Sequence, residues 1–226
     1  MEVTLTLSAN AGVAVRFGER RIWVDALHDK KLERFSTVTP KMQQQLLQQP
    51  AFSHPDYICY THCHPDHYSE HLTDVATRIW PNARIFAPDG KYRCTEPVME
   101  PDFSIRYMAL PHEGEQYRDV AHYGIVLSSQ GKNILLCGDC ALCSQELLEQ
   151  TKDMKIDLML LTFPWLTMPK ANHFLKEHFA DSKKVYYHLP FEEDDVFGYR
   201  RAAMKAAQRD GGILLSEPFQ QVNINI

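Results

Sequence analysis

The sequence predicts an α/β sandwich formed by a single domain spanning residues 1–226. Two observations predict this class. Short apolar runs of strand length alternate with helix-length amphipathic segments along the chain, and no repeat, low-complexity tract or Gly/Ser linker interrupts them. The 226 residues suit one large domain with a core of normal size. The hydrophobic fraction of 44% and the charged fraction of 23% are ordinary for a globular protein.

Charge and apolar patterns exclude several classes of protein. The net charge is −5 and the basic residues occur as isolated pairs, so neither a nucleic acid nor a membrane is an expected partner. No apolar stretch approaches the roughly 18 residues of a transmembrane helix. Six unevenly spaced cysteines do not match a secreted disulfide scaffold, so the cytoplasm is the expected compartment. The expected partner is a small-molecule substrate, and the oligomeric state is left open.

The first quarter of the chain predicts three strands and then a helix. Apolar residues separated by short turns predict strands at 2–7, 12–17 and 21–25. The helix is expected over 41–49, because Thr39 is a good N-cap and Pro40 suits the first helical position.

The rest of the chain alternates between strand and helix patterns. A strand at 56–61 precedes a helix at 69–79, which Pro81 ends. Further strands are expected at 83–87, 105–110, 123–128, 133–137, 158–162 and 184–188. Further helices are expected at 144–152, 171–179 and 193–209, the last closed by Gly211-Gly212, followed by a strand pair at 213–216 and 221–226. Nearly every candidate ligand below follows a predicted strand, where the loops of an α/β sheet converge.

The most informative segment is Thr61-His62-Cys63-His64-Pro65-Asp66-His67, at the end of a predicted strand. It places three imidazoles and a carboxylate within a short loop, and these ligands suit zinc, iron or manganese. Composition alone would produce His-x-His-x-Asp-His about 0.002 times in such a chain. An extended loop of this length cannot aim every side chain at one ion, but it can present two faces to two adjacent ions. The alternative is a histidine-rich surface loop.

The chain resembles the metallo-β-lactamase superfamily in this segment and in three strand ends, and the resemblance covers nearly its whole length. Members carry His-x-His-x-Asp-His after a strand, here introduced by 55–61. The other matches are an early strand ending in Asp25, a later strand ending in Gly138-Asp139, and a C-terminal strand followed by His188. Length and spacing are most similar to the branch of ascorbate-phosphate lactonases and small metal-dependent hydrolases. The resemblance implies a four-layer αββα sandwich with the site at one edge.

The resemblance also implies a site for two metal ions. The implied ligands are His62, His64 and a middle histidine for the first ion, and Asp66, His67 and His188 for the second. Asp139 would bridge the two ions, since one carboxylate oxygen per ion partly neutralises two cations. The middle histidine is either His112, which ends a predicted strand, or His122, which precedes the next; His112 is favoured. Zinc is the expected metal, with manganese or iron as alternatives.

Hydrolysis is the expected reaction. Two divalent ions lower the pKa of a bridging water from about 15.7 toward about 7, and the resulting hydroxide attacks an ester, a lactone or a phosphodiester. Asp66 is a candidate for orienting this water, and His122 and Tyr68 are candidates for protonating the leaving group. For Tyr68 the alternative is a packed aromatic ring. Asp25 is expected to hold the histidine-rich loop by hydrogen bonds, or else to serve as a turn residue.

The substrate is left open by departures from the family pattern. Many relatives have Gly-His where this chain has Ala9-Asn10, and Thr or Ser where it has Cys140. A phosphodiester, a phosphorylated sugar lactone and an acyl ester or amide all suit a two-metal hydroxide. Basic residues that are candidates for binding an anionic group are Lys91, Arg93 and Lys170.

Three functions other than hydrolysis have some support in the sequence. Cys137, Cys140 and Cys143 have the spacing that opens an iron–sulfur motif, but no suitably spaced fourth cysteine follows, so buried core cysteines are favoured. A mono- or di-iron oxidoreductase of the dioxygenase type is the main alternative. Di-iron reductases of the superfamily, however, have Glu where this chain has His64. A non-catalytic binding protein is the third class, although every expected ligand has a candidate here.

Overall fold

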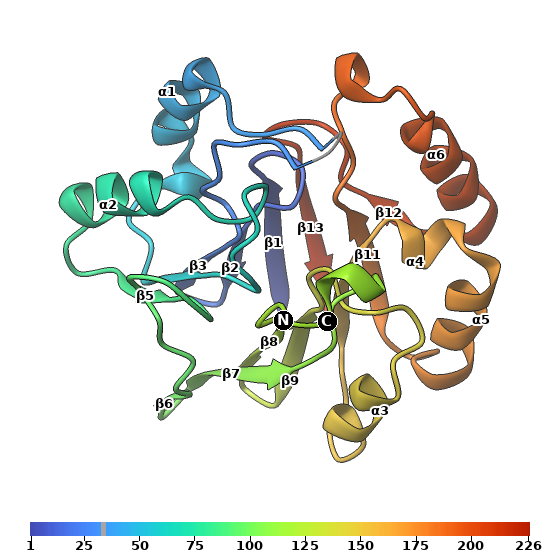
Figure 1. Cartoon of the computed structure of the whole chain (residues 1–226). Helices are drawn as coiled ribbons and strands as arrows, with labels where there is room; N and C mark the ends of the chain where they lie inside the picture. Colours follow the sequence, from blue (N-terminus) through green and yellow to red (C-terminus); the bar gives the residue numbers. More distant parts are fainter. Residues whose placement is uncertain (33–34) are drawn as a thin grey trace.

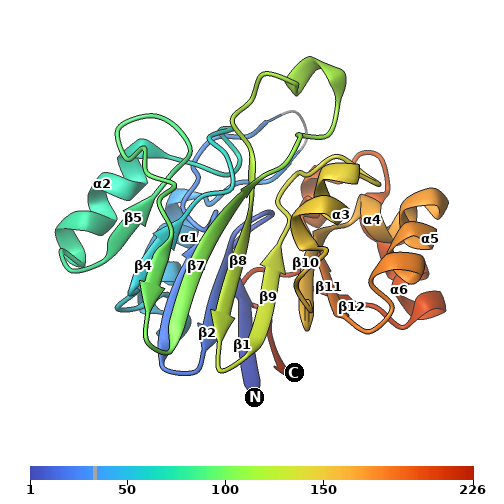
Figure 2. The same ribbon diagram turned by 90° about the horizontal axis from the view of Figure 1, so that it is seen from below.

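Two β-sheets lie face to face at the centre of the molecule, with helices on both outer sides (Figures 1 and 2). The computed structural model describes residues 1–32 and 35–226. The first sheet contains β1 (Glu2–Leu7), β2 (Val13–Phe17), β3 (Arg20–Val24), β4 (Tyr57–Cys59), β5 (Arg84–Phe86) and β13 (Gln221–Asn225). The second contains β6 (Val98–Glu100), β7 (Phe103–Ala109), β8 (Tyr123–Ser129), β9 (Lys132–Leu136), β10 (Leu158–Thr162), β11 (Lys183–Tyr187) and β12 (Ile213–Leu214).

Both sheets are mixed. In the first, the order is β13-β1-β2-β3-β4-β5. Each strand from β13 through β3 is antiparallel to its neighbour, whereas β3, β4 and β5 run parallel. In the second, the order is β12-β11-β10-β9-β8-β7-β6. Each strand from β6 through β9 is antiparallel to its neighbour, whereas β9, β10, β11 and β12 run parallel. Because β7 and β9 are both antiparallel to β8, they run in the same direction. The carboxyl ends of β7, β9, β10 and β11 therefore meet at one edge of the second sheet.

The helices complete four layers. Helices α1 (Pro40–Gln48) and α2 (Glu70–Ile79) cover the outer face of the first sheet, and α3 to α6 lie on the outer side of the second (Figure 1). The latter are α3 (Gln145–Thr151), α4 (Pro164–Thr167), α5 (Pro169–His178) and α6 (Tyr199–Asp210). Short 3-10 turns occur at η1 (Pro50–Phe52), η2 (Glu115–Tyr117) and η3 (Glu192–Asp194). Side chains of Thr39, Ser69 and Ser144 cap α1, α2 and α3. Among the described residues, no helix has both the length and the apolar character needed to span a bilayer.

The core has three apolar layers that follow from strand alternation. Successive side chains of a strand point to opposite faces, so Leu160 of β10 packs between the two sheets, whereas Leu161 packs against the helices. In the first sheet, Ile22 packs between the sheets and Trp23 packs under α1 and α2. Both faces of these strands are buried, which explains why their sequences are continuously apolar.

The predicted α/β sandwich is confirmed, and two of the differences from the predicted elements concern the C-terminal part of the chain. The helix expected over 193–209 begins only at Tyr199, because Gly198 has φ 74° and η3 precedes it. The strands at the C-terminus do not pair with each other: β12 pairs with β11 in the second sheet, and β13 pairs with β1 in the first. Strand β6 and helix α4 were not predicted.

Candidate metal centre

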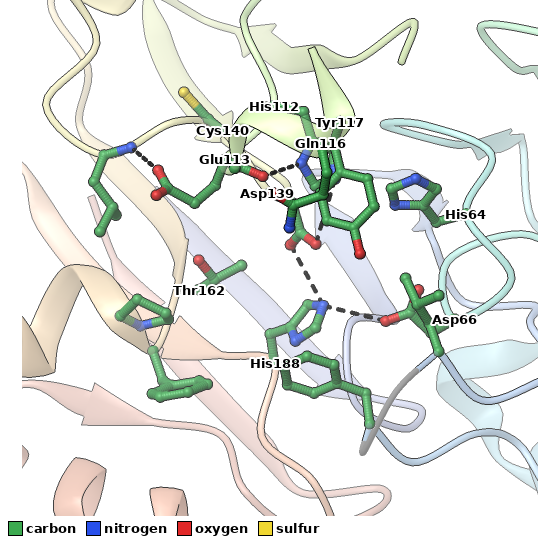
Figure 3. A pocket seen from close by; sticks show the side chains of 16 residues that line it. His64, Asp66, His112, Glu113, Gln116, Tyr117, Asp139, Cys140, Thr162 and His188 are labelled. Atoms are coloured by element: carbon green, nitrogen blue, oxygen red, sulfur yellow. Dashed lines mark hydrogen bonds and ion pairs between the residues drawn. The ribbon is translucent and has the colours of Figure 1, made fainter. Parts of the chain in front are cut away.

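The candidate ligands come from loops that follow four different strands. The histidine-rich loop leaves β4, His112 follows β7, Asp139 follows β9, and His188 follows β11. These residues are up to 126 positions apart in the sequence, from 62 to 188, and their ligand atoms converge. Figure 3 shows His64, Asp66, His112, Asp139 and His188 around one cavity. All seven predicted ligands belong to groups that could hold a metal ion.

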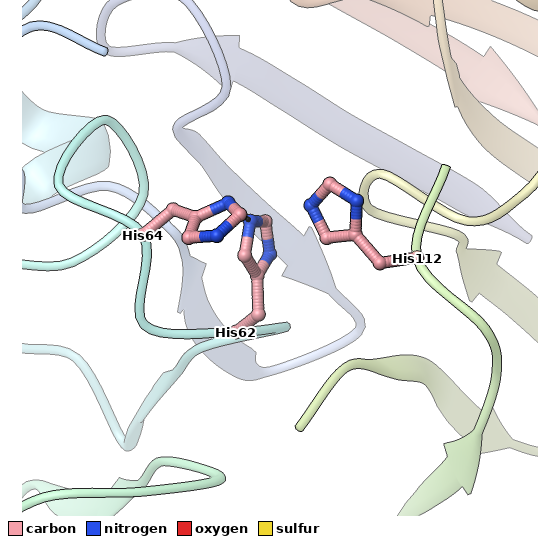
Figure 4. Close-up of side chains that lie close together, drawn as sticks. All are labelled: His62, His64 and His112. Atoms are coloured by element: carbon pink, nitrogen blue, oxygen red, sulfur yellow. Dashed lines mark hydrogen bonds between the residues drawn. The ribbon is translucent and has the colours of Figure 1, made fainter. Parts of the chain in front are cut away.

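The first group is formed by His62, His64 and His112, whose ligand atoms lie within 4.8 Å of one another (Figure 4). His62 Nε2 and His64 Nδ1 are 3.0 Å apart. Two imidazole nitrogens bound to one tetrahedral zinc at about 2.1 Å would be about 3.4 Å apart, so a small adjustment of this pair fits a shared cation. His112 Nδ1 donates a hydrogen bond to the carbonyl oxygen of Glu113 (2.7 Å), which leaves its Nε2 as a lone-pair donor. That Nε2 is buried and has no hydrogen-bond partner.

The second group is formed by Asp66, His67 and His188. His67 Nε2 and His188 Nε2 are 2.9 Å apart, and Asp66 Oδ2 lies 3.7 Å from His188 Nε2. Asp66 is 1% exposed, and its Oδ1 has no hydrogen-bond partner. A buried carboxylate oxygen without a partner is costly unless a cation or a donor satisfies it. The donor set and its orphaned atoms therefore fit a second metal ion.

Asp139 lies between the two groups. Its Oδ2 is 3.4 Å from His67 Nε2 and 3.8 Å from His112 Nε2, and its Oδ1 is 3.4 Å from His188 Nε2. Figure 3 shows His188 between the carboxylates of Asp66 and Asp139. One carboxylate thus reaches histidines of both groups, which is the position that a bridging ligand requires.

Electrostatics at the cluster favour a cation. Burial lowers the pKa of His62 and of His64, so both are neutral lone-pair donors at physiological pH. Burial alone would also lower the pKa of His67, but the carboxylates of Asp139 and Asp66 outweigh it and raise this pKa well above its usual value. Burial would likewise raise the pKa of Asp139, yet His188 and His67 hold it well below its usual value. Positive charge is stabilised where the carboxylates meet the imidazoles.

Asp25 supports the ligand loop from behind. Its buried carboxylate accepts hydrogen bonds from Thr61 N (2.8 Å) and Thr61 Oγ1 (2.7 Å), and its Oδ2 is 3.0 Å from His67 Nδ1. Asp25, Asn10 and His188 have φ values of 52°, 46° and 66°, a region that costs free energy for residues other than glycine. Asn10 Nδ2 reaches Asp66 Oδ2 at 3.5 Å. Strained backbone therefore borders the cluster.

His122 and Tyr68, the two candidate proton donors, lie outside the ligand groups. His122 Nδ1 donates to the Leu110 carbonyl oxygen (3.1 Å), and burial lowers its pKa to about 3. Gly138, at φ 55°, allows His122 and Thr61 to approach, since a Cβ there would lie 2.8 Å from His122 Nε2 and from Thr61 Oγ1. The Tyr68 ring packs against Tyr60 with centroids 4.8 Å apart. Neither residue is among the described residues that line the cavity over the cluster.

A cavity of about 340 Å³ opens over the cluster and is lined by His64, Asp66, His112, Asp139 and His188. The other described lining residues are Leu32, Phe35, Glu113, Gly114, Gln116, Tyr117, Cys140, Leu142, Thr162, Phe163 and Pro164. The residues that the sequence did not indicate are Leu32, Phe35, Leu142, Thr162, Phe163 and Pro164. Thr162 ends a predicted strand and Phe163 and Pro164 follow it, a signal that could have found them, whereas Phe35 and Leu142 carry no such signal. Lys91, Arg93 and Lys170 are not among the described lining residues.

Known protein structures identify the fold. No family model and no curated protein sequence matches the chain. A possible metal-dependent hydrolase from Veillonella parvula is similar, with TM-score 0.71 and 12% identity over 98% of this chain and 99% of that one. The metallo-β-lactamase fold protein YhfI from Bacillus subtilis has TM-score 0.66 and 13% identity over 98% and 99%. CmlA, a diiron β-hydroxylase from Streptomyces venezuelae, has TM-score 0.63 and 12% identity over 99% of this chain and 54% of that one. The chain has the metallo-β-lactamase fold.

Proposed function

We propose that the chain is a metal-dependent hydrolase that uses two divalent ions to cleave a small-molecule ester, lactone or phosphodiester. The observation that carries the proposal is the convergence of seven N and O ligands, with Asp139 between the two groups. The similar fold of a possible metal-dependent hydrolase from Veillonella parvula adds support. Zinc is the proposed metal, with manganese as an alternative, since imidazole and carboxylate ligands discriminate weakly between them.

Each group of residues has a defined part in this proposal. Bound divalent cations would supply Lewis acidity, which lowers the pKa of water and stabilises negative charge on the reacting oxygen. The three histidines 62, 64 and 112 would hold one cation, and Asp66, His67 and His188 would hold the other. Asp139 would contact both. Asp66 also lines the cavity, so it is positioned either as a ligand or to orient the attacking water.

Two side chains, His122 and Tyr68, are the candidates for protonating the leaving group. His122 is buried, and with Nδ1 donating to Leu110 and a pKa of about 3, its Nε2 carries no proton at neutral pH. Tyr68 packs against Tyr60 and is not among the described residues that line the cavity. The geometry favours neither residue, and both roles stay predictions. Water in the cavity is the simplest source of this proton.

A second candidate function is oxidation by an iron centre. CmlA, a diiron β-hydroxylase, has a similar fold over its matching half, so this fold also accommodates iron chemistry in that protein. The residues here do not favour iron over zinc, since the described ligand set contains only histidine and aspartate.

Metal content and metal-dependent turnover test the proposal together. We expect two equivalents of metal per chain after reconstitution with zinc or manganese, measured by elemental analysis; less than about half an equivalent would contradict the two-ion centre. Zinc-loaded protein should hydrolyse a member of a panel of chromogenic phosphodiesters, lactones and thioesters without oxygen, because hydrolysis needs only a Lewis acid. Asp139→Ala should abolish this turnover, and Asp157→Ala, which removes an aspartate outside the cluster, should not. Turnover that requires both iron and oxygen would instead support the oxidoreductase.

A further inference from the structure

We propose that the cavity over the ligand cluster takes an uncharged carboxylic acid derivative, an ester, thioester or amide, that carries an apolar substituent. The inference rests on the proposed hydrolase function and narrows its substrate, which the ligand chemistry alone leaves open between acyl and phosphoryl compounds. Its basis is the part of the cavity that the metal ligands do not form.

Part of the cavity lining is apolar. This apolar wall consists of Leu32, Phe35, Leu142, Phe163 and Pro164. Phe35 packs edge-on against His188 with ring centroids 4.4 Å apart, so the wall begins directly beside the ligands. Phe163 follows β10, is 6% exposed, and packs against Tyr199 at 5.0 Å, which fixes its position. An apolar substituent of a substrate reacting at the cluster would lie on this wall and lose its contact with water.

The rest of the described lining, outside the metal ligands, is polar but offers no positive charge. Among the lining residues that the structure describes it contains Glu113, Gln116, Tyr117 and Thr162, and neither lysine nor arginine. The Glu113 carboxylate accepts a hydrogen bond from Leu142 N (2.6 Å), so a negative charge is anchored at the edge of the apolar wall. A phosphodiester or a phosphorylated sugar would bring anionic oxygens near this carboxylate without a described cationic side chain to balance them. An acyl compound places one carbonyl oxygen at the cluster and needs no further cation.

The size and chemistry of the cavity agree with this class. A volume of about 340 Å³ is near the lower end of the range for small-molecule sites, about 300–1,000 Å³. Hydrolysis consumes one water: a bond forms between its oxygen and the acyl carbon, and the bond from that carbon to the leaving oxygen, sulfur or nitrogen breaks. The leaving atom takes one proton of the water, and the carboxylic acid releases the other as it ionises.

A chain-length series measures the apolar wall in the zinc-loaded protein. With p-nitrophenyl acetate, butyrate and hexanoate, kcat/KM should rise by up to about fourfold for each added methylene until the cavity is filled. Bis-p-nitrophenyl phosphate, which has the same leaving group, should be the poorest substrate once each uncatalysed rate is taken into account. If kcat/KM does not change with the chain length of the ester, or if the rate enhancement is greater for the phosphodiester than for the esters, the proposal is overturned, while a metal-dependent hydrolase remains.

Binding of unreactive amides provides a readout that does not depend on turnover. Affinity for butanamide, hexanamide and octanamide, measured by titration calorimetry, should increase with chain length. Leu142→Ser should flatten this increase, whereas Leu47→Ser, an exposed leucine of α1 outside the cavity, should leave it unchanged. Leu142→Lys should bring the rates for the hexanoate and the phosphodiester closer together, because it adds a cation beside Glu113. If the amides behave as expected but loaded protein turns over no substrate, the hydrolase proposal fails and the apolar binding site stands. Amide affinity that is independent of chain length overturns the site itself.

Discussion

Asp25 illustrates how a single buried side chain can fix a metal-binding loop. Its two carboxylate oxygens face three donors, namely the amide and hydroxyl of Thr61 and the Nδ1–H of His67. The bond to Asp25 keeps a proton on His67 Nδ1, so that Nε2 would offer its lone pair to a cation that displaces its own proton. Such a partner behind a ligand orients the imidazole and increases its basicity. The strained φ of Asp25 is compatible with this role, because the surrounding hydrogen bonds determine its conformation.

Asp25→Asn should therefore weaken metal binding without removing a ligand. The amide keeps the shape of the carboxylate, but its NH₂ would face a donor, so at least one of the three hydrogen bonds is lost. We expect affinity to fall by about 10–100-fold, measured by competition with a chromogenic chelator. Asp157→Asn is the matched control, since Asp157 is also buried but accepts hydrogen bonds from Asn133 N and Lys132, outside the cluster. An equal loss of affinity in both variants would show that Asp25 acts through general stability.

Individual site residues differ in how far the sequence reveals them. The histidine-rich motif is local, so its four candidate ligands are evident from spacing alone. His112 and His122 both flank predicted strands, and only the three-dimensional arrangement groups His112 with His62 and His64. Phe35 could not be assigned to the cavity from the sequence, because its place beside His188 depends on contacts between residues 153 positions apart. Side chains that line a cavity without binding metal have no characteristic spacing.

Among the elements, the link between β4 and α2 is the one on which the site depends most directly. The ligand loop occupies the residues between them, and Ser69 ends it by capping α2 through a hydrogen bond from Leu72 N to Ser69 Oγ (3.2 Å). Ser69 N also donates to the Leu27 carbonyl oxygen (2.8 Å), so the start of the helix is anchored to the loop after β3.

Loss of this cap should reduce stability but leave the metal centre intact. Ser69→Ala removes the acceptor for Leu72 N, which should lower the free energy of unfolding by about 1 kcal/mol in urea titrations of metal-loaded protein. Ser69→Thr keeps a hydroxyl and should recover most of this loss. Metal stoichiometry should be unchanged in both variants. Loss of metal from Ser69→Ala would mean that the cap positions the ligands as well as the helix.

Element boundaries were predictable where local signals agree and were missed where tertiary contacts decide. Thr39 and Pro40 predicted the start of α1 correctly. The start of α6 was placed too early because its N-terminal signal is unusual: the Asp195 carboxylate accepts from Tyr199 N (2.8 Å) and Arg200 N (2.9 Å) across Gly198. The two C-terminal strands were recognised, but not their partners. A strand pattern specifies which faces are apolar, and it does not specify which sheet edge is free to accept the strand.

At the scale of the whole molecule, the metal centre and the apolar core are separate. The three core layers lie between and outside the sheets, whereas the ligands sit on loops at the strand ends. Core side chains such as Leu160 and Trp23 are fully buried and make no contact that depends on a metal ion. A chain of this size can bury a sufficient core without a metal, so the ions should stabilise a fold that already exists.

Removal of metal should therefore lower the melting temperature without unfolding the chain. A ligand present at 100 times its Kd stabilises the folded state by about 2.7 kcal/mol, which corresponds to about 5–10 °C for each ion in a protein of this size. After treatment with a chelator, far-UV circular dichroism at 25 °C should be unchanged, while the melting temperature measured by calorimetry should fall. Restoring zinc should restore the melting temperature. Collapse of the circular dichroism signal on chelation would instead show that the ligand loops are part of the folding core.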